Sequence, residues 1–184
     1  NRIYTRYRET CDFLLEEGAL PQQIDAALIE FGFKMGLYAV SDMSGLDISW
    51  AMRKRRAASR DPKARYSSIA DKICEAGRLG QKTGSGWFRY AEDSKTPEVE
   101  PWVTAVSESE SKRLGYTRRS FTNAEIMERV METMAEEAQA VLDEGIALRA
   151  SDVDLTMVTG FGFPRHQGGP LFWASQREVS KSAT

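Results

Sequence analysis

Few residues in this chain have side chains that could do chemistry, and their spacing favours structural roles. The 184-residue sequence contains one histidine, His166, and two cysteines, Cys11 and Cys74. No Asp, Glu or Cys lies in the segment around His166, so we expect it to form structural hydrogen bonds rather than to act as a base or a ligand. The cysteines share no short motif, and we expect buried thiols, with a disulfide as the weaker alternative. No metal site is predicted.

The charged groups that could bind phosphate or move protons also have simpler interpretations. The loop at residues 80–86 has Lys and Thr among glycines, but a phosphate-binding loop needs Gly directly before the Lys. Gln81 stands there, so we predict a turn. The basic run at residues 53–56 could bind phosphate, although a solvated helix face is the favoured interpretation. Four carboxylates at predicted helix ends are expected to be solvated and not paired for acid–base work: Glu16, Glu17, Asp143 and Glu144.

Helices must position these residues, because apolar residues recur with helical spacing and no strand-like alternation is convincing. Residues 1–17 predict a helix that ends at Gly18, and a second helix has Pro21 in its first turn. A compact loop at residues 33–38 is followed by a predicted helix at residues 41–56 and by a shorter one that ends before Gly77. The predicted fold class is therefore all-α.

The later part of the chain carries clearer start signals. Thr122 and Glu125 have the spacing of a capping box, in which each side chain binds a backbone N–H of the other residue, and a long amphipathic pattern follows. Ser151 and Asp154 repeat that spacing, which predicts another helix start. Between the two parts, residues 92–121 are polar and poor in core residues, so we place a linker there, with room for one packed turn.

The sequence also contains an internal duplication. The string Leu-Glu-Glu-Gly-Ala at residues 15–19 recurs as Leu-Asp-Glu-Gly-Ile at residues 142–146, and Phe-Gly-Phe occurs at residues 31–33 and 161–163. We predict two tandem copies of one helical unit, packed as a pseudo-dimer. Because a second unit can cover the apolar face that a single unit would bury by dimerisation, we expect a monomer. The predicted boundaries are residues 1–91 for the first unit and residues 122–184 for the second unit.

The composition excludes several classes of protein. The net charge of −2 argues against a broad nucleic-acid surface, and an apolar fraction of 41% is enough for a packed core. No apolar run is long enough to span a bilayer, and we recognise no signal segment at the start. The first residue is Asn rather than Met, so we expect a fragment or a processed product.

Several strings in this sequence resemble 3-hydroxyacyl-CoA dehydrogenases. Residues 31–36 and 41–47 are similar to the C-terminal part of that family, as is the Asn-Arg pair at residues 1–2. Residues 80–90 resemble the loop that closes the family's first C-terminal domain. Residues 161–170 resemble the second C-terminal domain of the multifunctional fatty-acid oxidation enzymes. The strings occur in the family's order, and the resemblance covers about residues 1–90 and 112–174, which is nearly the whole chain.

The resemblance implies a reaction and a missing domain. The reaction is the NAD-linked oxidation of (3S)-3-hydroxyacyl-CoA to 3-ketoacyl-CoA, a step of fatty-acid β-oxidation. NAD would be bound by an N-terminal domain absent from this chain, because the sequence has no Gly-x-Gly-x-x-Gly turn after a strand. The family's catalytic His and its Glu partner belong to that domain as well, so we expect the fragment alone to be inactive.

The resemblance places one catalytic residue and one substrate-binding segment in this chain. Asn1 matches an Asn that lies beside the substrate in the family, where an amide donor would favour the charge that develops on the substrate oxygen. Without the resemblance, Asn1 would be a helix cap or a loose terminus. The matching position in the second unit is Glu128, which is expected to have no such role. Met35, Gly36 and Leu37 match a family segment near the acyl-chain pocket.

The expected partners are the acyl-CoA substrate and the enzyme's own N-terminal NAD and hydratase regions, with no nucleic acid and no membrane. The expected location is the bacterial cytoplasm, with the peroxisomal matrix as the alternative. A second hypothesis is a non-catalytic helical interaction or dimerisation module that kept the duplicated fold and lost the chemistry. A Gly-x-Gly-x-x-Gly unit followed by a His and a Glu, encoded before Asn1 in the parent gene, would favour the enzyme.

Overall fold

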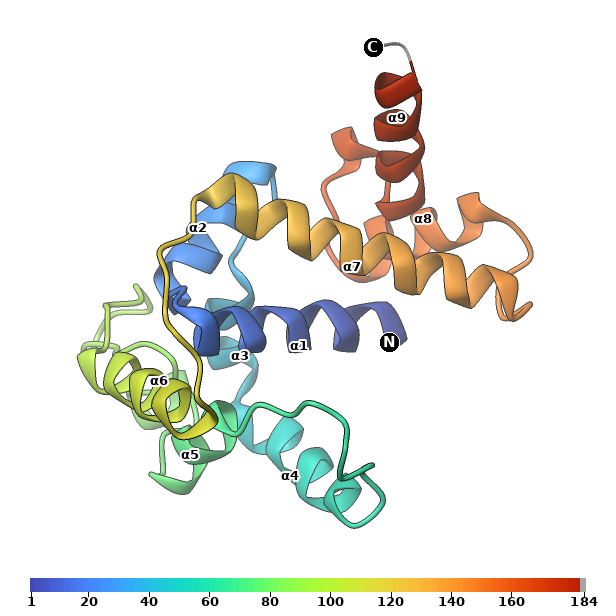
Figure 1. Cartoon of the computed structure of the whole chain (residues 1–184). Helices are drawn as coiled ribbons and strands as arrows, with labels where there is room; N and C mark the ends of the chain where they lie inside the picture. The colour runs from blue at the N-terminus through green and yellow to red at the C-terminus, as the bar shows by residue number, and fades with distance from the viewer. Residues whose placement is uncertain (183–184) are drawn as a thin grey trace.

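The chain folds into helices joined by short loops, and the computed structural model describes residues 1–182 (Figure 1). Within that range only isolated β-bridges occur, between residues 80 and 98, so the predicted all-α class is confirmed. Residues 183–184 of the predicted second unit lie outside the described range. The helices are α1 (Arg2–Glu17), α2 (Pro21–Phe31), α3 (Leu37–Ser44), α4 (Leu46–Ala57), α5 (Ile69–Glu75), α6 (Pro101–Leu114), α7 (Asn123–Asp143), α8 (Ala150–Gly160) and α9 (Pro170–Ser182), with 3-10 helices η1 (Gln81–Thr83) and η2 (Arg165–Gln167).

The first two helices form as their sequence signals predict. Ile3, Tyr7 and Cys11 recur at helical spacing along α1 and are buried, so this face of α1 packs into the core. The helix ends at Gly18, whose φ of 131° disfavours side chains with a Cβ. Pro21 occupies the first turn of α2, where the missing N–H of proline would be unpaired anyway.

The single helix predicted at residues 41–56 is in fact two helices. α3 begins earlier, at Leu37, and ends at Ser44, while α4 begins at Leu46. Gly45 between them has a φ of 89°, which interrupts the helical backbone. The prediction was wrong because the apolar pattern continues across the break, and a single glycine inside such a pattern does not show which backbone conformation it adopts.

One buried carboxylate fixes the glycine-rich loop after α5. Asp42, in α3, accepts hydrogen bonds of 2.9 Å from the backbone N–H groups of Trp87 and Phe88, and one of 3.0 Å from the Tyr90 hydroxyl. Gly86 permits this close approach, since a Cβ at that position would lie 2.0 Å from Asp42 Oδ1. The loop is therefore a turn, as predicted, and its glycines serve backbone packing.

The segment predicted as a linker contains a regular helix. α6 is 14 residues long, has Pro101 in its first turn, and packs on α1 and α5. Val103 is buried, and the buried Glu110 accepts hydrogen bonds from Ser68 and from Arg113. The helix exceeds the single turn that the sequence predicts, because a narrow buried face is enough to attach it to the first unit. The unit boundaries on either side of it stay a prediction.

The second unit opens with one confirmed start signal and one wrong one. In the capping box of α7, the N–H of Glu125 donates to Thr122 Oγ1 at 3.2 Å, and the N–H of Thr122 donates to Glu125 Oε2 at 2.7 Å. The start predicted at Ser151 is wrong, because α8 begins at Ala150 without a side-chain cap. The Asp154 carboxylate binds the start of a different helix, α9.

Each unit contains the same capping arrangement. Asp25 in α2 accepts two hydrogen bonds of 2.9 Å from backbone N–H groups at the start of α3. Asp154 in α8 accepts two, of 2.9 and 3.0 Å, from backbone N–H groups at the start of α9. The first turn of a helix has unpaired N–H groups and a partial positive charge. A carboxylate there accepts hydrogen bonds from these N–H groups and is attracted by the charge. The two units are therefore equivalent in this hydrogen-bonding detail as well as in sequence.

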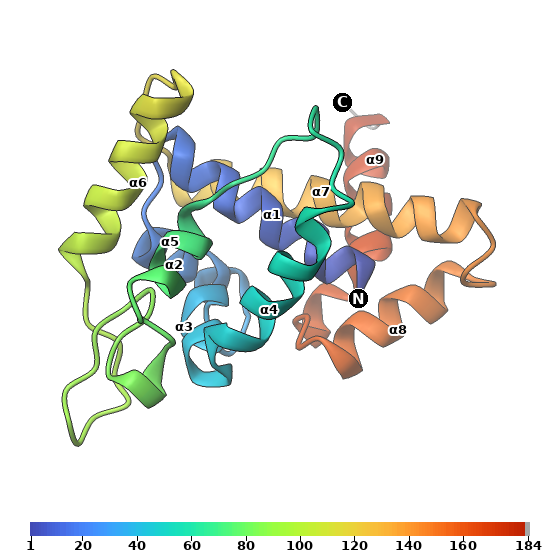
Figure 2. The same cartoon turned by 90° about the horizontal axis from the view of Figure 1, so that it is seen from below.

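Helices α1 and α7 lie side by side and antiparallel between the two units (Figures 1 and 2). Arg2, at the start of α1, donates to Glu144 at 2.6 Å, and Arg129, near the start of α7, donates to Glu17 at 2.9 Å. In the sequence repeat, Arg2 corresponds to Arg129 and Glu17 corresponds to Glu144. Reciprocal contacts of this kind are typical of a two-fold interface, and they are consistent with the predicted pseudo-dimer packing.

The hydrophobic core is continuous across the two units. Leu14 and Ile24 of the first unit and Val130 and Met134 of the second unit are completely buried in one cluster. Full burial of an aliphatic side chain contributes about 1.5–3 kcal/mol, so this shared core stabilises both units.

Candidate functional site

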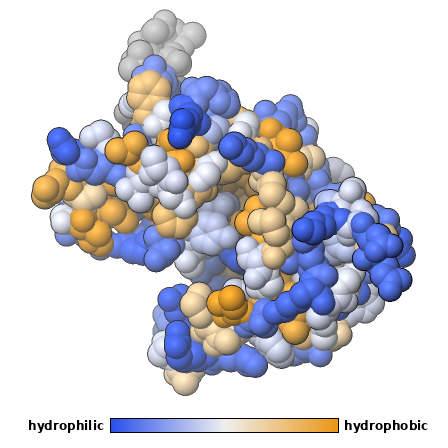
Figure 3. Space-filling view, turned by 180° about the vertical axis from the view of Figure 1, so that it is seen from behind, coloured by the Kyte–Doolittle hydropathy of each residue, from blue (hydrophilic) through white to orange (hydrophobic). Residues whose placement is uncertain are grey.

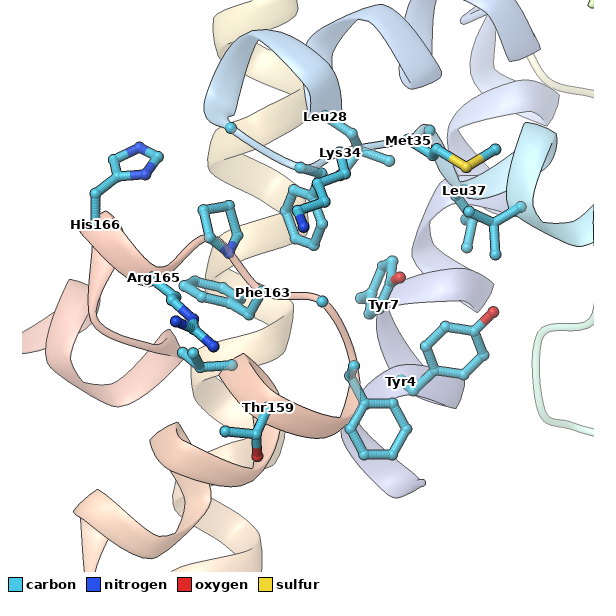
Figure 4. Close-up of a pocket in the computed structure, with 18 residues that line it drawn as sticks. Tyr4, Tyr7, Leu28, Lys34, Met35, Leu37, Thr159, Phe163, Arg165 and His166 are labelled. Atoms are coloured by element: carbon cyan, nitrogen blue, oxygen red, sulfur yellow. The ribbon is translucent and has the colours of Figure 1, made fainter.

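A cavity of about 790 Å³ lies between the two units (Figure 4). Its wall includes Tyr4 and Tyr7 from α1, residues 32–37 at the end of α2 and the start of α3, Val158 and Thr159 from α8, and residues 161–166 in the loop that follows. The face of the molecule seen from behind is hollowed near its centre (Figure 3). Small-molecule sites usually have volumes of about 300–1,000 Å³, so the cavity is large enough to hold one.

Aromatic rings of both units form part of this wall. Phe163, which is 2% exposed, lies edge-on to Phe31 and Phe33, with ring centroids 6.1 and 5.7 Å apart. The ring of Phe161 lies 5.9 Å from that of Tyr4 on α1. Edge-on aromatic pairs are attractive beyond the area they bury. The two Phe-Gly-Phe strings of the sequence repeat therefore meet across the interface between the units.

The edge of the cavity is basic. Lys34, Arg165 and His166 line it and are exposed, and no Asp or Glu occurs among the lining residues. Among the described residues, no carboxylate forms an ion pair with Lys34 or Arg165. His166 lies at one end of the cavity and Tyr4 at the opposite end (Figure 4). The apolar wall thus ends at a polar, solvated edge.

The segment predicted to bind substrate lies in this wall. Met35, Gly36 and Leu37 all line the cavity, with Met35 39% exposed and Leu37 buried. A Cβ at Gly36 would lie 2.0 Å from Cγ of Asp25, so only glycine fits against the carboxylate that caps α3. The structure brings the three residues together with the second unit, while their role in substrate binding stays a prediction.

Two carboxylates, the buried Asp25 and the half-buried Asp12, hold α3 in position. Burial raises the pKa of Asp25 to about 6, with its two backbone N–H donors opposing the shift. Burial also raises the pKa of Asp12 to about 6, opposed by the Arg8 guanidinium. Asp12 accepts a hydrogen bond of 3.1 Å from the hydroxyl of Tyr38. Neither carboxylate lines the cavity, so both position α3 rather than face a ligand.

Asn1, the predicted catalytic residue, lies outside this cavity. It is exposed, precedes α1 as the N-cap residue, and makes no side-chain capping bond. It borders a separate depression of about 230 Å³ together with Arg2, Arg6 and Arg56. A helix rises about 1.5 Å per residue, so Tyr4, which lines the larger cavity, is about 5 Å from Asn1 along the helix axis. The two predicted sites are therefore adjacent and separate.

Several charged residues predicted to be solvated are instead paired. Arg53 binds Asp71 with an Nε–Oδ1 distance of 2.7 Å, and its side chain is only 20% exposed. Glu16 and Glu17 bind Arg65 at 2.9 and 2.8 Å, and Glu16 is completely buried. Sequence patterns missed these ion pairs because the partners lie far apart in the chain and meet only in the fold.

The single histidine packs against the first unit, and the two cysteines are buried. A Cβ at Gly32 would lie 2.4 Å from Cε1 of His166, so the imidazole packs closely on the first unit, and its Nε2 lies 3.4 Å from Gln167 Nε2. Cys11 and Cys74 are buried free thiols, as predicted, and burial raises the pKa of each. The buried free thiols confirm the prediction for the cysteines, while a structural role of His166 stays a prediction.

Sequence reasoning missed the contribution of the second unit to the cavity. Val158, Thr159 and Phe161 line it alongside the first unit. The available signal was the repeated Phe-Gly-Phe string, which marks an equivalent loop in each unit. The repeat does not show that the two loops face each other.

The residues present do not form a metal or dinucleotide site of a known kind. Within residues 1–182, no three His, Cys, Asp or Glu side chains gather closely enough to hold a metal ion. The same range forms no parallel sheet, so it lacks the strand ends at which a dinucleotide fold binds its cofactor. No helix of the described part is both long and apolar enough to cross a membrane.

The fold and a family model define the class of this protein. Residues 1–90 match the model described as "3-hydroxyacyl-CoA dehydrogenase, C-terminal domain". Residues 1–90 therefore belong to the 3-hydroxyacyl-CoA dehydrogenase family and represent its C-terminal domain.

Two curated relatives show the extent of the similarity. A peroxisomal bifunctional enzyme of Danio rerio is 42% identical over 95% of this chain, and one of Homo sapiens is 38% identical over the same share. The chain spans 26% of the length of each. The relatives are thus similar to nearly all of this chain, which corresponds to about a quarter of their length.

Two solved structures share the fold. The dehydrogenase part of multifunctional enzyme 1 from C. elegans matches with a TM-score of 0.70 and 26% identity, covering 92% of this chain and 37% of that one. The 3-hydroxybutyryl-CoA dehydrogenase of Escherichia coli K12 matches with a TM-score of 0.66 and 20% identity, covering 95% of this chain and 52% of that one. The second match supports the fold alone.

Proposed function

We propose that this chain is the part of an NAD-dependent 3-hydroxyacyl-CoA dehydrogenase that closes over the acyl-CoA substrate. The parent protein would oxidise (3S)-3-hydroxyacyl-CoA to 3-ketoacyl-CoA in fatty-acid β-oxidation. The observation that carries the proposal is the family match over residues 1–90, which includes both Asn1 and the cavity-lining segment at residues 35–37. A relative from Arabidopsis thaliana, 32% identical, is named a peroxisomal fatty acid beta-oxidation multifunctional protein.

In this proposal Asn1 acts on the reacting end of the substrate. Its side-chain amide makes no capping bond to α1 and is exposed, so it is available to donate to a substrate oxygen. A fixed neutral donor stabilises the negative charge that builds up on that oxygen more than it stabilises the ground state. Met35, Gly36 and Leu37 would contact the acyl chain from the adjacent cavity.

The cofactor would be bound elsewhere in the parent protein. The described residues form no dinucleotide fold, so we assign no NAD contact to this chain. The proposed partners are the substrate and the NAD-binding and hydratase regions of the same parent protein. The reciprocal ion pairs between α1 and α7 support a monomer, because the second unit occupies the place of a dimer partner. The names of the relatives favour a peroxisomal location over the bacterial cytoplasm.

The test uses the full-length parent protein with Asn1 replaced by alanine. Loss of one donor to a developing oxyanion lowers kcat by about 10²–10³, and we expect a fall of that size in NADH formation from 3-hydroxybutyryl-CoA. Glu128→Ala, at the matching position of the second unit, is the control and should leave kcat unchanged. A normal kcat in the Asn1→Ala protein would exclude the catalytic role. Absence of NADH formation by the unsubstituted parent would favour the non-catalytic helical module instead. The chain by itself is expected to be inactive.

A further inference from the structure

We propose that the cavity between the two units binds the distal part of the substrate's acyl chain, and that residues of the second unit select its length. This inference rests on the proposed dehydrogenase function, because it takes Asn1 to mark the reacting end of the substrate. It gives the second unit a role in substrate selection in addition to covering the first unit.

Part of the cavity wall lies on α1, within two helical turns of Asn1. Tyr4 and Tyr7 line it from successive turns of α1 (Figure 4), at about 5 and 9 Å from Asn1 along the helix axis. Leu37 and Phe163, which are 3% and 2% exposed, continue the apolar wall. An acyl chain whose head reacts beside Asn1 would therefore meet aromatic and aliphatic side chains of both units in this direction.

The second unit forms one side of this path. Val158 and Thr159 line the cavity from the end of α8, and Phe161 lines it from the loop that follows. The Phe161 ring lies 5.9 Å from the Tyr4 ring, so the two units meet directly along the path. Without the second unit, a chain lying along α1 would have solvent on one side, and its burial would be incomplete.

The edge of the cavity limits the length of acyl chain that can be buried in it. The apolar wall ends at Lys34, Arg165 and His166, whose side chains are exposed to solvent. Each methylene buried before that edge is expected to raise kcat/KM roughly fourfold, while methylenes beyond it return to solvent and add nothing. The preference for longer substrates should therefore rise with chain length and then level off.

Filling the cavity from the second unit tests the inference in the full-length parent protein. Thr159→Trp adds a large ring at an exposed position of the cavity wall, and Val158→Trp does so at a half-buried one. Thr156→Trp is the matched control. Thr156 and Thr159 are both exposed on α8, and each donates a hydrogen bond of 2.7 Å to the carbonyl four residues earlier, but Thr156 lies outside the cavity.

The readout is kcat/KM with 3-hydroxybutyryl-CoA and with 3-hydroxyhexadecanoyl-CoA, with melting temperatures to show that each variant folds. Displacing about two methylenes should lower kcat/KM for the long substrate roughly tenfold or more and leave the short one unchanged. The control should change neither. An equal loss with both substrates, or an unchanged ratio, would overturn the inference while leaving the dehydrogenase function intact. A parent protein that oxidises neither substrate would overturn the function and the inference together.

Discussion

Replacing Asp25 with alanine probes how the first unit holds its cavity-lining segment in place. The carboxylate is 6% exposed and binds the backbone N–H groups of Tyr38 and Ala39, each at 2.9 Å. Alanine would leave both N–H groups buried without an acceptor at the start of α3. An unpaired buried donor costs about 1–3 kcal/mol. Relative to the unsubstituted protein with Asp25 protonated, losing both acceptors should therefore lower the free energy of unfolding by about 2–6 kcal/mol.

The size of the effect should depend on pH with a definite sign. Burial raises the pKa of Asp25 to about 6, against 3.8 for the free side chain. The folded chain then binds more protons than the unfolded one between about pH 4 and pH 6, so the stability of the unsubstituted protein falls as the pH rises through this window. This contribution is close to 3 kcal/mol at most and is lost in the variant. The destabilisation by Asp25→Ala should therefore be larger at pH 4 than at pH 7.

Urea unfolding followed by circular dichroism, at pH values from 4 to 7, measures both quantities. Asp154→Ala is a matched variant in the second unit, because Asp154 caps α9 in the same way and burial also raises its pKa. It should show a pH trend of the same sign. Asp143→Ala, at an exposed carboxylate, should have little effect. A destabilisation by Asp25→Ala that grows between pH 4 and pH 7 would refute the reasoning, because the hydrogen bonds to the ionised form would then outweigh its burial.

Two further predictions concern packing and the interface between the units. Gly36→Ala would place a Cβ 2.0 Å from Cγ of Asp25 and should lower the unfolding free energy by more than about 2 kcal/mol, whereas Gly160→Ala, with open space around it in α8, should be neutral or stabilise by up to about 1 kcal/mol. Equal urea midpoints for the two variants would contradict this. A double-mutant cycle on Arg129 and Glu17 should give a coupling of about 0.5–1 kcal/mol that weakens in high salt, and no coupling at low salt would show that the pair does not hold the units together.

Much of the local structure could be predicted from the sequence, because its signals act over a few residues. The capping box of Thr122 and Glu125 joins groups three positions apart, and Pro21 and Gly18 act through their own backbone dihedrals. The strings of the resemblance also led to the correct family. Gly45 shows where this approach ends, because the apolar pattern continues across it and does not reveal the φ of 89° that separates α3 from α4.

The candidate site could be predicted only in part. The segment at residues 35–37 was found through its resemblance to a family string, and it does line a cavity. Phe161 and Arg165 were not found, because they lie more than a hundred positions away and reach the cavity only through the packing of the second unit.

The sequence by itself determined most of the helices, the duplication and the family, since periodicity, caps and motif strings are written in consecutive residues. Only the tertiary structure decided which buried charges are paired, how the two units face each other and that a cavity lies between them. Asp154, read as a cap for its own helix, binds the start of α9 instead. Glu17, read as solvated, holds Arg129 of the other unit. Such contacts join groups that are distant in the chain. These hydrogen bonds and ion pairs can form only after the packing of the core has brought the groups together.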